Sequence, residues 1–180
     1  MFVKVCGITA AEQIDWAVRL GYSAIGVVMH RRSPRFCGAE RGRELASHAR
    51  GRIASVAVGV SYEEIAAWRD TFDYLQAYDY RDMDRYLYAG VMEPPAGCRS
   101  LFIYDASRGS GRAGSLPSWL HSIRDRLIIS GGLAPETVSR VIREYRPFGV
   151  DVSSGVEAAR GKKDYHLMER FIAEVRHACE

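Results

Sequence analysis

"GVDVSSGVE", residues 149–157, begins as an alternating apolar run and then breaks into Asp151, two serines and a glycine. The run predicts a buried strand over 148–152, because successive strand residues face opposite sides of a sheet. "RLIISGGL", residues 126–133, repeats the arrangement, with a strand over 126–130 followed by Gly131 and Gly132. Both stretches therefore indicate strands whose carboxyl ends carry small and polar residues.

Six further runs of the same kind precede these two, which brings the number of expected strands to eight. Each run is short, nearly all apolar and rich in β-branched or aromatic residues, as buried parallel strands are. The six runs are 2–5, 24–29, 53–60, 74–78, 86–91 and 101–104.

Helical patterns follow most of the expected strands. Thr9 and Glu12 are spaced as a capping box ahead of a first helix, which Gly21 would end, and Ser61 and Glu64 repeat that spacing after the third strand. The other helices are expected over about 40–50 and 116–123, from Pro135 onward and from near Asp164 onward.

Alternating strands and helices predict an α/β fold, and eight strands of this kind favour a closed (β/α)8 TIM barrel over residues 1–180 as a single domain. An open flavodoxin-like sheet is the alternative. Such barrels typically need about 250 residues and rarely fall below about 200, so this chain of 180 is shortened. The strands at 74, 86 and 101 start too close together for full helices, which predicts that helices four and five are reduced or missing. The trimming would expose apolar strand flanks, which a homodimer could cover.

Composition narrows the function classes. The net charge of +3 is spread along the chain, which favours anionic small molecules and argues against nucleic acid. No apolar stretch approaches the roughly 20 residues of a membrane helix, so we expect no membrane partner and a cytoplasmic location. The four cysteines show no CxxC pairing and the five histidines fit no ligand spacing, so neither a disulfide nor a metal site is expected.

In a barrel the functional residues follow the strands, at their carboxyl ends. Cys6 and Gly7 follow the first strand, "HRRSPRF" the second, Asp105 and "ASRGSGRAG" the sixth, "SGGL" the seventh and "SSGVE" the eighth. Backbone N–H groups at Gly131, Gly132 and Gly155, together with Ser153 and Ser154, could converge on a phosphate. The alternative is that these glycines serve only as turn residues.

Four motifs together carry a resemblance to a known family. "KVCGIT" at 4–9, "SPRF" at 33–36, "SGGL" at 130–133 and "DVSSGVE" at 151–157 resemble phosphoribosylanthranilate isomerases of tryptophan biosynthesis. The resemblance covers nearly the whole chain, apart from the trimmed middle, by which we mean the shortened region between about residues 78 and 101. It implies a (β/α)8 barrel that performs a cofactor-free Amadori rearrangement on a phosphorylated aminosugar, with a cysteine as base and an aspartate as acid.

By this resemblance Cys6 is the general base and Asp105 the general acid. The acid would protonate the ribose ring oxygen, and the base would remove the C2′ proton from the resulting Schiff base. Cys6 must then lose its proton near neutral pH, so its pKa has to fall. Lys4 is a candidate for lowering it, because residues two apart on a strand face the same side.

The resemblance also implies substrate contacts. Arg35 matches an arginine that faces the substrate's anthranilate carboxylate, and Asp151 matches an aspartate that binds substrate or organises the site. Gln76 is similar to a family glutamine, but Tyr78 stands where a histidine is common. Two further pairs of arginines lie in loops: Arg31 and Arg32 in a basic loop that we expect to be solvated, and Arg108 and Arg112 in a lid that could touch the substrate.

Two other functions stay open at this point. The chain could be a phosphate-binding barrel that has lost catalysis, which its missing helical material would suggest. It could also be another phosphosugar isomerase or epimerase, although pentose-phosphate epimerases carry metal-ligating His and Asp residues at their strand ends, and this chain lacks that pattern.

Overall fold

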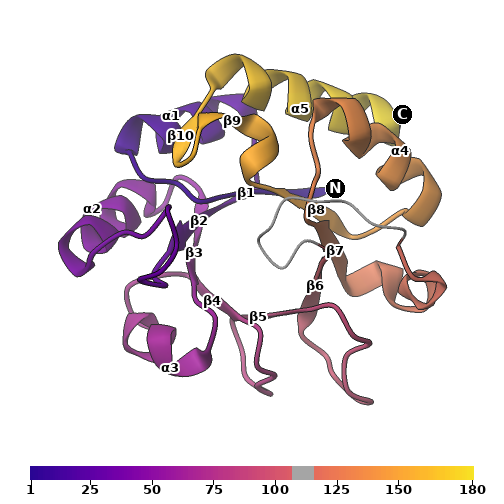
Figure 1. Ribbon diagram of the computed structural model, residues 1–180, viewed down its shortest axis with the longest axis horizontal. Helices are drawn as coiled ribbons and strands as arrows, with labels where there is room; N and C mark the ends of the chain where they lie inside the picture. Colours follow the sequence, from indigo (N-terminus) through magenta and orange to yellow (C-terminus); the bar gives the residue numbers. More distant parts are fainter. Residues whose placement is uncertain (107–115) are drawn as a thin grey trace.

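Eight parallel strands close into a barrel in the computed structural model, which describes residues 1–106 and 116–180. The strands follow one another around the ring in chain order (Figure 1). They are β1 (Phe2–Cys6), β2 (Ala24–Val28), β3 (Ala54–Val58), β4 (Tyr74–Ala77), β5 (Tyr86–Gly90), β6 (Leu101–Asp105), β7 (Leu127–Ser130) and β8 (Gly149–Val152). The eight expected strands are all present, and the predicted TIM barrel is confirmed.

Pairing of the last strand with the first closes the ring. β8 runs parallel to β1, and Lys4 lies opposite Asp151 in their register. The open flavodoxin-like alternative is therefore wrong, because an open sheet would leave β1 or β8 without this neighbour.

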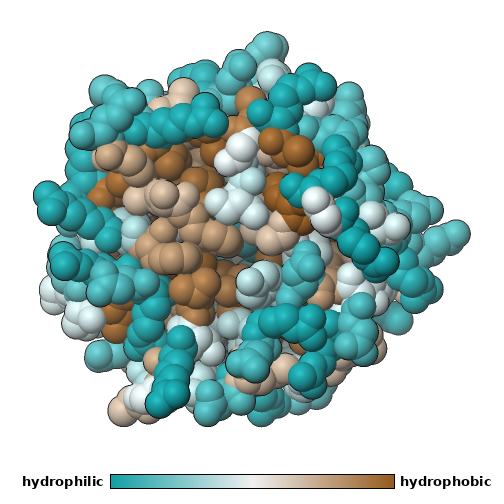
Figure 2. Space-filling model, turned by 180° about the vertical axis from the view of Figure 1, so that it is seen from behind, coloured by the Kyte–Doolittle hydropathy of each residue, from teal (hydrophilic) through white to brown (hydrophobic). Residues whose placement is uncertain are grey.

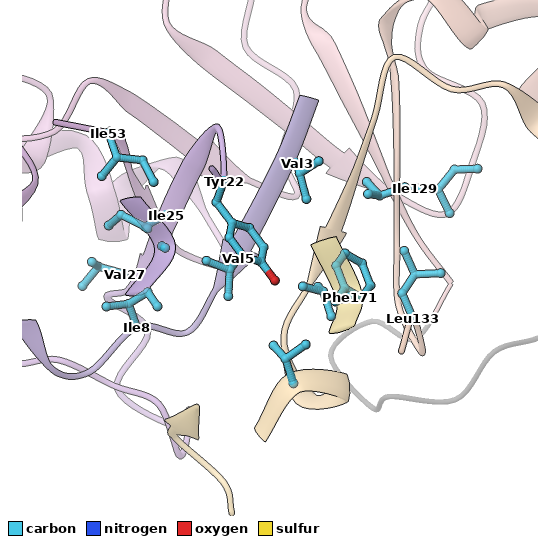
Figure 3. Close-up of a cluster of buried hydrophobic side chains, with 14 of the residues drawn as sticks. Val3, Val5, Ile8, Tyr22, Ile25, Val27, Ile53, Ile129, Leu133 and Phe171 are labelled. Atoms are coloured by element: carbon cyan, nitrogen blue, oxygen red, sulfur yellow. The ribbon is translucent and has the colours of Figure 1, made fainter. Parts of the chain in front are cut away.

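Alternation along the strands separates two apolar regions. Val3 and Val5 face outward and pack with Tyr22 and Phe171 in the layer between strands and helices (Figure 3). Lys4 and Cys6 face the barrel interior, where Cys6 packs with a second cluster that includes Ile103 and Ile128. The period of two along β1 thus places a cationic and a nucleophilic side chain on the inside of the barrel.

Four helices cover one side of the ring. They are α1 (Ala11–Leu20), α2 (Ala39–Ala49), α4 (Pro135–Tyr145) and α5 (Tyr165–Cys179), and α5 packs against both α1 and α4 (Figure 1). Shorter helical pieces follow β3 and precede β7: α3 (Tyr62–Ile65), the 3₁₀ turn η1 (Ala66–Trp68) and the 3₁₀ segment η2 (Ser118–Arg126).

The trimmed middle has no helix between β4 and β5 or between β5 and β6, where all connecting residues are described. This confirms the expected loss of helices four and five. A row of aromatic rings covers the outer side of these strands instead: Tyr80, Tyr88, Phe102 and Trp119 follow one another at centroid distances of 5.6, 5.3 and 6.1 Å. Phe102 is completely buried in this row, whereas Met92 in the connection between β5 and β6 is 73% exposed.

At neither expected capping box does the Thr or Ser side chain cap the helix. Ala10 is the N-cap of α1, and Thr9 instead donates its hydroxyl to the Gly161 carbonyl at 2.6 Å. Ser61 is the N-cap of α3 without a side-chain cap, while Glu64 accepts from the Val60 N–H at 2.8 Å. A tertiary contact thus replaces capping at Thr9, which binds a loop distant in sequence, whereas Glu64 binds a backbone N–H only four residues away.

A short hairpin follows β8 and was not expected. The 3₁₀ turn η3 (Ser154–Val156) leads into β9 (Glu157–Ala159), which pairs with β10 (Lys162–Lys163) in antiparallel fashion. The hairpin carries Glu157 and Lys163 to the carboxyl ends of the strands. In the part of the chain that the structure describes, no helix has the length and apolar character needed to span a bilayer.

Candidate active site

A cavity of about 650 Å³ opens at the carboxyl ends of the strands. Residues from β1, β2, β3, β4, β6, β7 and β8 and from the loops that follow these strands line it. Of the residues predicted from the sequence, Cys6, Arg35, Asp105, Gly131, Gly132, Asp151, Ser153 and Ser154 all line this cavity. Gln76 and Tyr78 line it as well. The structure therefore gathers nearly every predicted residue around one space.

Lys4 and Asp151 form a buried ion pair beneath Cys6. Lys4 Nζ lies 2.9 Å from Asp151 Oδ1, and Ser130 Oγ donates to Asp151 Oδ2 at 3.2 Å. Burial lowers the pKa of Lys4, but the negative charge of Asp151 and the Cys6 thiol outweigh that effect and raise it overall. Lys4 is thus a fixed cation next to Cys6, as its spacing on β1 predicts.

The Cys6 thiol behaves differently from the expectation. Burial raises its pKa, the charge of Lys4 opposes the rise, Asp151 adds to it, and the pKa is raised overall. Cys6 Sγ packs closely over β2, where a Cβ on Gly26 would come within 2.9 Å of it. Lys4 only partly offsets the desolvation of the thiol, because Lys4 is already paired with Asp151.

Asp105 ends β6 and is buried, with 8% of its surface exposed. The Tyr78 hydroxyl donates to Asp105 Oδ2 at 2.5 Å. In the ring of strands β7 and β8 lie between β6 and β1, so Asp105 and Cys6 approach the cavity from different sides. An acid and a base on different walls of one cavity can act on different atoms of one bound molecule.

Arg35 is held by the hairpin that follows β8. Its Nε and Nη2 donate to the two carboxylate oxygens of Glu157, both at 2.7 Å, and Lys163 Nζ donates to Glu157 Oε1 at 2.8 Å. Burial disfavours the charge on Glu157, but Arg35 and Lys163 outweigh burial and hold the pKa of Glu157 below its usual value. Because Glu157 occupies one edge of the guanidinium, the N–H groups of Nη1 remain as donors toward an anion.

The glycine loops after β7 and β8 lie against each other. Gly131 and Gly132 have positive φ values of 86° and 72°, which favour glycine over any other residue. Gly155 does not line the cavity, and a Cβ there would collide with the Leu133 carbonyl oxygen. Ser153 also lines the cavity, and its hydroxyl donates to the Cys6 carbonyl at 3.0 Å, so its side chain connects the end of β8 to the end of β1.

Comparison with known proteins places the chain in a family. The family model described as "N-(5'phosphoribosyl)anthranilate (PRA) isomerase" matches residues 95–174. The N-(5'-phosphoribosyl)anthranilate isomerase of Dechloromonas aromatica (strain RCB) is 33% identical, in an alignment that covers 99% of this chain and 97% of that protein. That of Ralstonia pickettii (strain 12J) is 31% identical, with 98% and 93% covered. The chain belongs to the N-(5'-phosphoribosyl)anthranilate isomerase family. It is therefore an isomerase of tryptophan biosynthesis.

Solved structures of the N-(5'-phosphoribosyl)anthranilate isomerase family have the same fold. The chain is similar to TrpF from Jonesia denitrificans, with a TM-score of 0.84, 28% identity and coverage of 99% of this chain and 98% of that one. A phosphoribosylanthranilate isomerase in complex with reduced 1-(o-carboxyphenylamino)-1-deoxyribulose 5-phosphate gives a TM-score of 0.77 at 27% identity, with 98% and 99% covered. The alignments with the Dechloromonas and Ralstonia isomerases span 205 and 217 positions, more than the 180 residues of this chain. The relatives therefore carry segments that this chain lacks.

The basic residues predicted near the site divide into three groups. Arg35 reaches the cavity, whereas Arg31 and Arg32 are exposed and do not line it, as expected of a solvated loop. Arg108 and Arg112 lie outside the described residues. Among the residues that the structure does describe, no group of three or more His, Cys, Asp and Glu side chains could hold a metal ion.

Sequence reasoning gave no role to several residues of this isomerase site. Glu157 lies inside the "DVSSGVE" motif, but only the folded chain shows that it clamps Arg35. Tyr78 stood out as a departure from the family, and no local pattern indicated its bond to Asp105. Gly7 has a φ of 80°, and a Cβ there would collide with the Arg35 Cδ atom, so the site requires glycine at this position. The one sequence feature that could have indicated this role is that Gly7 directly follows β1.

Proposed function

We propose that the chain converts N-(5-phosphoribosyl)anthranilate to 1-(2-carboxyphenylamino)-1-deoxyribulose 5-phosphate, with Asp105 as general acid and Cys6 as general base. The observation that carries the proposal is that one cavity contains both residues, the anion-facing Arg35 and the paired glycine loops. The family relationship supports the reaction, and the arrangement of the side chains supports the assignment of their roles.

The proposed reaction needs one proton delivered and one removed. Asp105 gives its proton to the ribose ring oxygen as the C1′–O bond breaks, and the lone pair of the anthranilate nitrogen forms the C1′=N bond of a Schiff base. Cys6 then removes the C2′ proton, and the electrons of the C–H bond form an enolamine. Transfer of the enol proton to C1′ gives the ketone. The substrate's own nitrogen is the electron sink, so acid and base suffice, each typically contributing about 10² to 10⁴ in rate.

The two ends of the substrate need anion-binding groups. We assign its phosphate to the loops of Gly131, Gly132 and Ser153–Gly155, where backbone N–H groups lie near the start of α4. Gly155 would serve by allowing the two loops to meet. We assign the carboxylate to the outer edge of Arg35.

Two residues deeper in the cavity have further proposed roles. Asp151 would organise the site through Lys4. Gln76 Oε1, which is buried without a hydrogen-bond partner among the described residues, would accept a hydrogen bond from the substrate.

Loss of anthranilate fluorescence tests the proposed activity, with N-(5-phosphoribosyl)anthranilate generated in situ. We expect Cys6→Ala and Asp105→Asn each to reduce kcat by about 10² to 10⁴, while Cys37→Ala, a buried cysteine that does not line the cavity, stays close to wild type. Turnover that survives in both site variants would reject the mechanism. Binding of the reduced product analogue without any turnover by the wild-type chain would favour the alternative, a phosphate-binding barrel without catalysis.

We also propose that the chain forms a homodimer through the face opposite the cavity. Met1, Tyr74 and Phe148 lie at the amino ends of strands and are between 38% and 47% exposed. Figure 2 shows apolar side chains gathered in the middle of this face, within a border of hydrophilic ones. A solved structure of monomers generated from the dimeric phosphoribosylanthranilate isomerase of Thermotoga maritima is 27% identical to this chain, with a TM-score of 0.74, and the parent enzyme is thus a dimer. Sedimentation at micromolar concentration should show a dimer, and a monomer would reject this part of the proposal.

A further inference from the structure

Tyr78 touches the proposed general acid directly. It follows β4, and its hydroxyl donates to Asp105 Oδ2 at 2.5 Å. The bond crosses β5, which lies between β4 and β6 in the ring and contributes the small residue Ala89 to the interior cluster at this level. The Tyr78 ring packs against that same cluster. The Tyr78 backbone is fixed by its place after β4, and its ring is held by the interior cluster. The hydroxyl therefore points toward the Asp105 carboxyl group.

The surroundings keep Tyr78 in its donor form. Burial raises the pKa of Tyr78, and negative charge on Asp105, Cys6 and Asp151 raises it further. The tyrosine therefore does not compete with Asp105 or Cys6 as a proton donor or acceptor near neutral pH. Among the described residues, the titratable and charged groups that act on the pair are Cys6 from β1, Asp151 from β8 with its partner Lys4, and Tyr104, which precedes Asp105 on β6.

We infer that Tyr78 is a positioning residue that orients the Asp105 carboxyl group and stabilises the carboxylate that forms when Asp105 gives up its proton. This inference rests on the proposed function, because it assigns Tyr78 a role through the general acid. A donor to a carboxylate stabilises its charged form, and a charge-assisted O–H···O bond is among the stronger hydrogen bonds in proteins. The hydroxyl thus stabilises the Asp105 carboxylate that remains after the proton transfer, and it contributes little to binding of the substrate.

The test is Tyr78→Phe, which removes only the hydroxyl and keeps the packed ring. At its own pH optimum we expect kcat to fall about tenfold with KM nearly unchanged. The pH–rate profile is recorded as well, because a purely structural role of the Tyr78 ring would leave it unchanged when only the hydroxyl is removed. Tyr22→Phe is the matched control: it removes a buried tyrosine hydroxyl, bound to the Met168 carbonyl, that lies outside the cavity. It should leave both kcat and the pH profile as in the wild type.

Variants of Asp105 separate the inference from the proposed function. In an Asp105→Asn background, Tyr78→Phe should have no further effect on the residual rate or its pH dependence. If Asp105→Asn is inactive while Tyr78→Phe keeps the wild-type kcat and pH profile, the role of Tyr78 is overturned and the proposed function stands. A rise in KM alone in Tyr78→Phe would also overturn it, since the hydroxyl would then bind substrate. Wild-type turnover by Asp105→Asn would overturn the proposed function itself.

Discussion

Lys4 Nζ and Asp151 Oδ1 lie 2.9 Å apart inside the barrel, although 147 positions separate the two residues in the chain. Both side chains are almost completely buried, with exposed fractions of 0% and 6%. The pair sits on the two strands that close the ring and lies next to the proposed base, Cys6. Stability and the chemistry of the thiol are therefore coupled at this one contact.

Lys4→Met should destabilise the protein strongly. The variant leaves Asp151 buried without its cation, and loss of one partner of a buried ion pair typically costs about 3–5 kcal/mol. Urea unfolding measures the change, with Arg170→Met as the control, because Arg170 pairs with Glu136 on the surface and exposed pairs contribute about 0–1 kcal/mol. Similar losses in the two variants would contradict the buried character of the Lys4–Asp151 pair.

Cys6 should react slowly with iodoacetamide at neutral pH in the absence of substrate. Because its pKa is raised by burial, the thiolate fraction below that pKa grows about tenfold with each pH unit. Alkylation of Cys6, followed by mass spectrometry, should therefore keep rising between about pH 7 and pH 9. Cys179 is exposed and provides the internal comparison. A Cys6 rate that reaches its plateau below about pH 8 would show that Lys4 outweighs burial.

Glu157→Gln should weaken substrate binding more than catalysis. The carboxylate holds Arg35 through two hydrogen bonds of 2.7 Å, and an amide can accept only one of them. We expect KM to rise about tenfold with a smaller change in kcat, because a guanidinium that loses its bidentate partner is less well oriented. Steady-state kinetics gives both values, and Glu44→Gln is the control, because Glu44 is an exposed carboxylate on α2 that pairs with Arg41 and does not line the cavity. A loss confined to kcat would contradict this role.

Gly155→Ala should destabilise the fold and weaken phosphate binding. The new Cβ would collide with the Leu133 carbonyl oxygen, and the Ala134 Cα lies 2.9 Å away, so the backbone of one loop must move. Overpacking of this kind typically costs about 1–3 kcal/mol. Gly38→Ala is the control, since no atom lies within 4 Å of its Cβ position. Thermal unfolding with and without inorganic phosphate measures both effects, and equal behaviour of the two variants would contradict the packing argument.

Much of the fold follows from local sequence features. The eight apolar runs predicted the strands to within two residues at each end, because a strand buried on both faces must be apolar nearly throughout. The spacing of the strands near 74, 86 and 101 also predicted the missing helices, since a helix cannot fit into so few residues. Helix starts were less predictable, as Thr9 shows: its hydroxyl binds the Gly161 carbonyl instead of capping α1.

The sequence by itself determined which residues reach the barrel mouth, because a residue that follows a parallel strand must lie at the carboxyl end of the barrel. Cys6, Asp105 and the glycine loops were identified on that ground and by the family motifs. Only the tertiary structure decided what those residues touch: Glu157 holds Arg35 from 122 positions away, and Tyr78 reaches Asp105 across an intervening strand. Such contacts depend on how the whole ring of strands closes and on the register of its strands. Neither can be predicted from a short stretch of sequence.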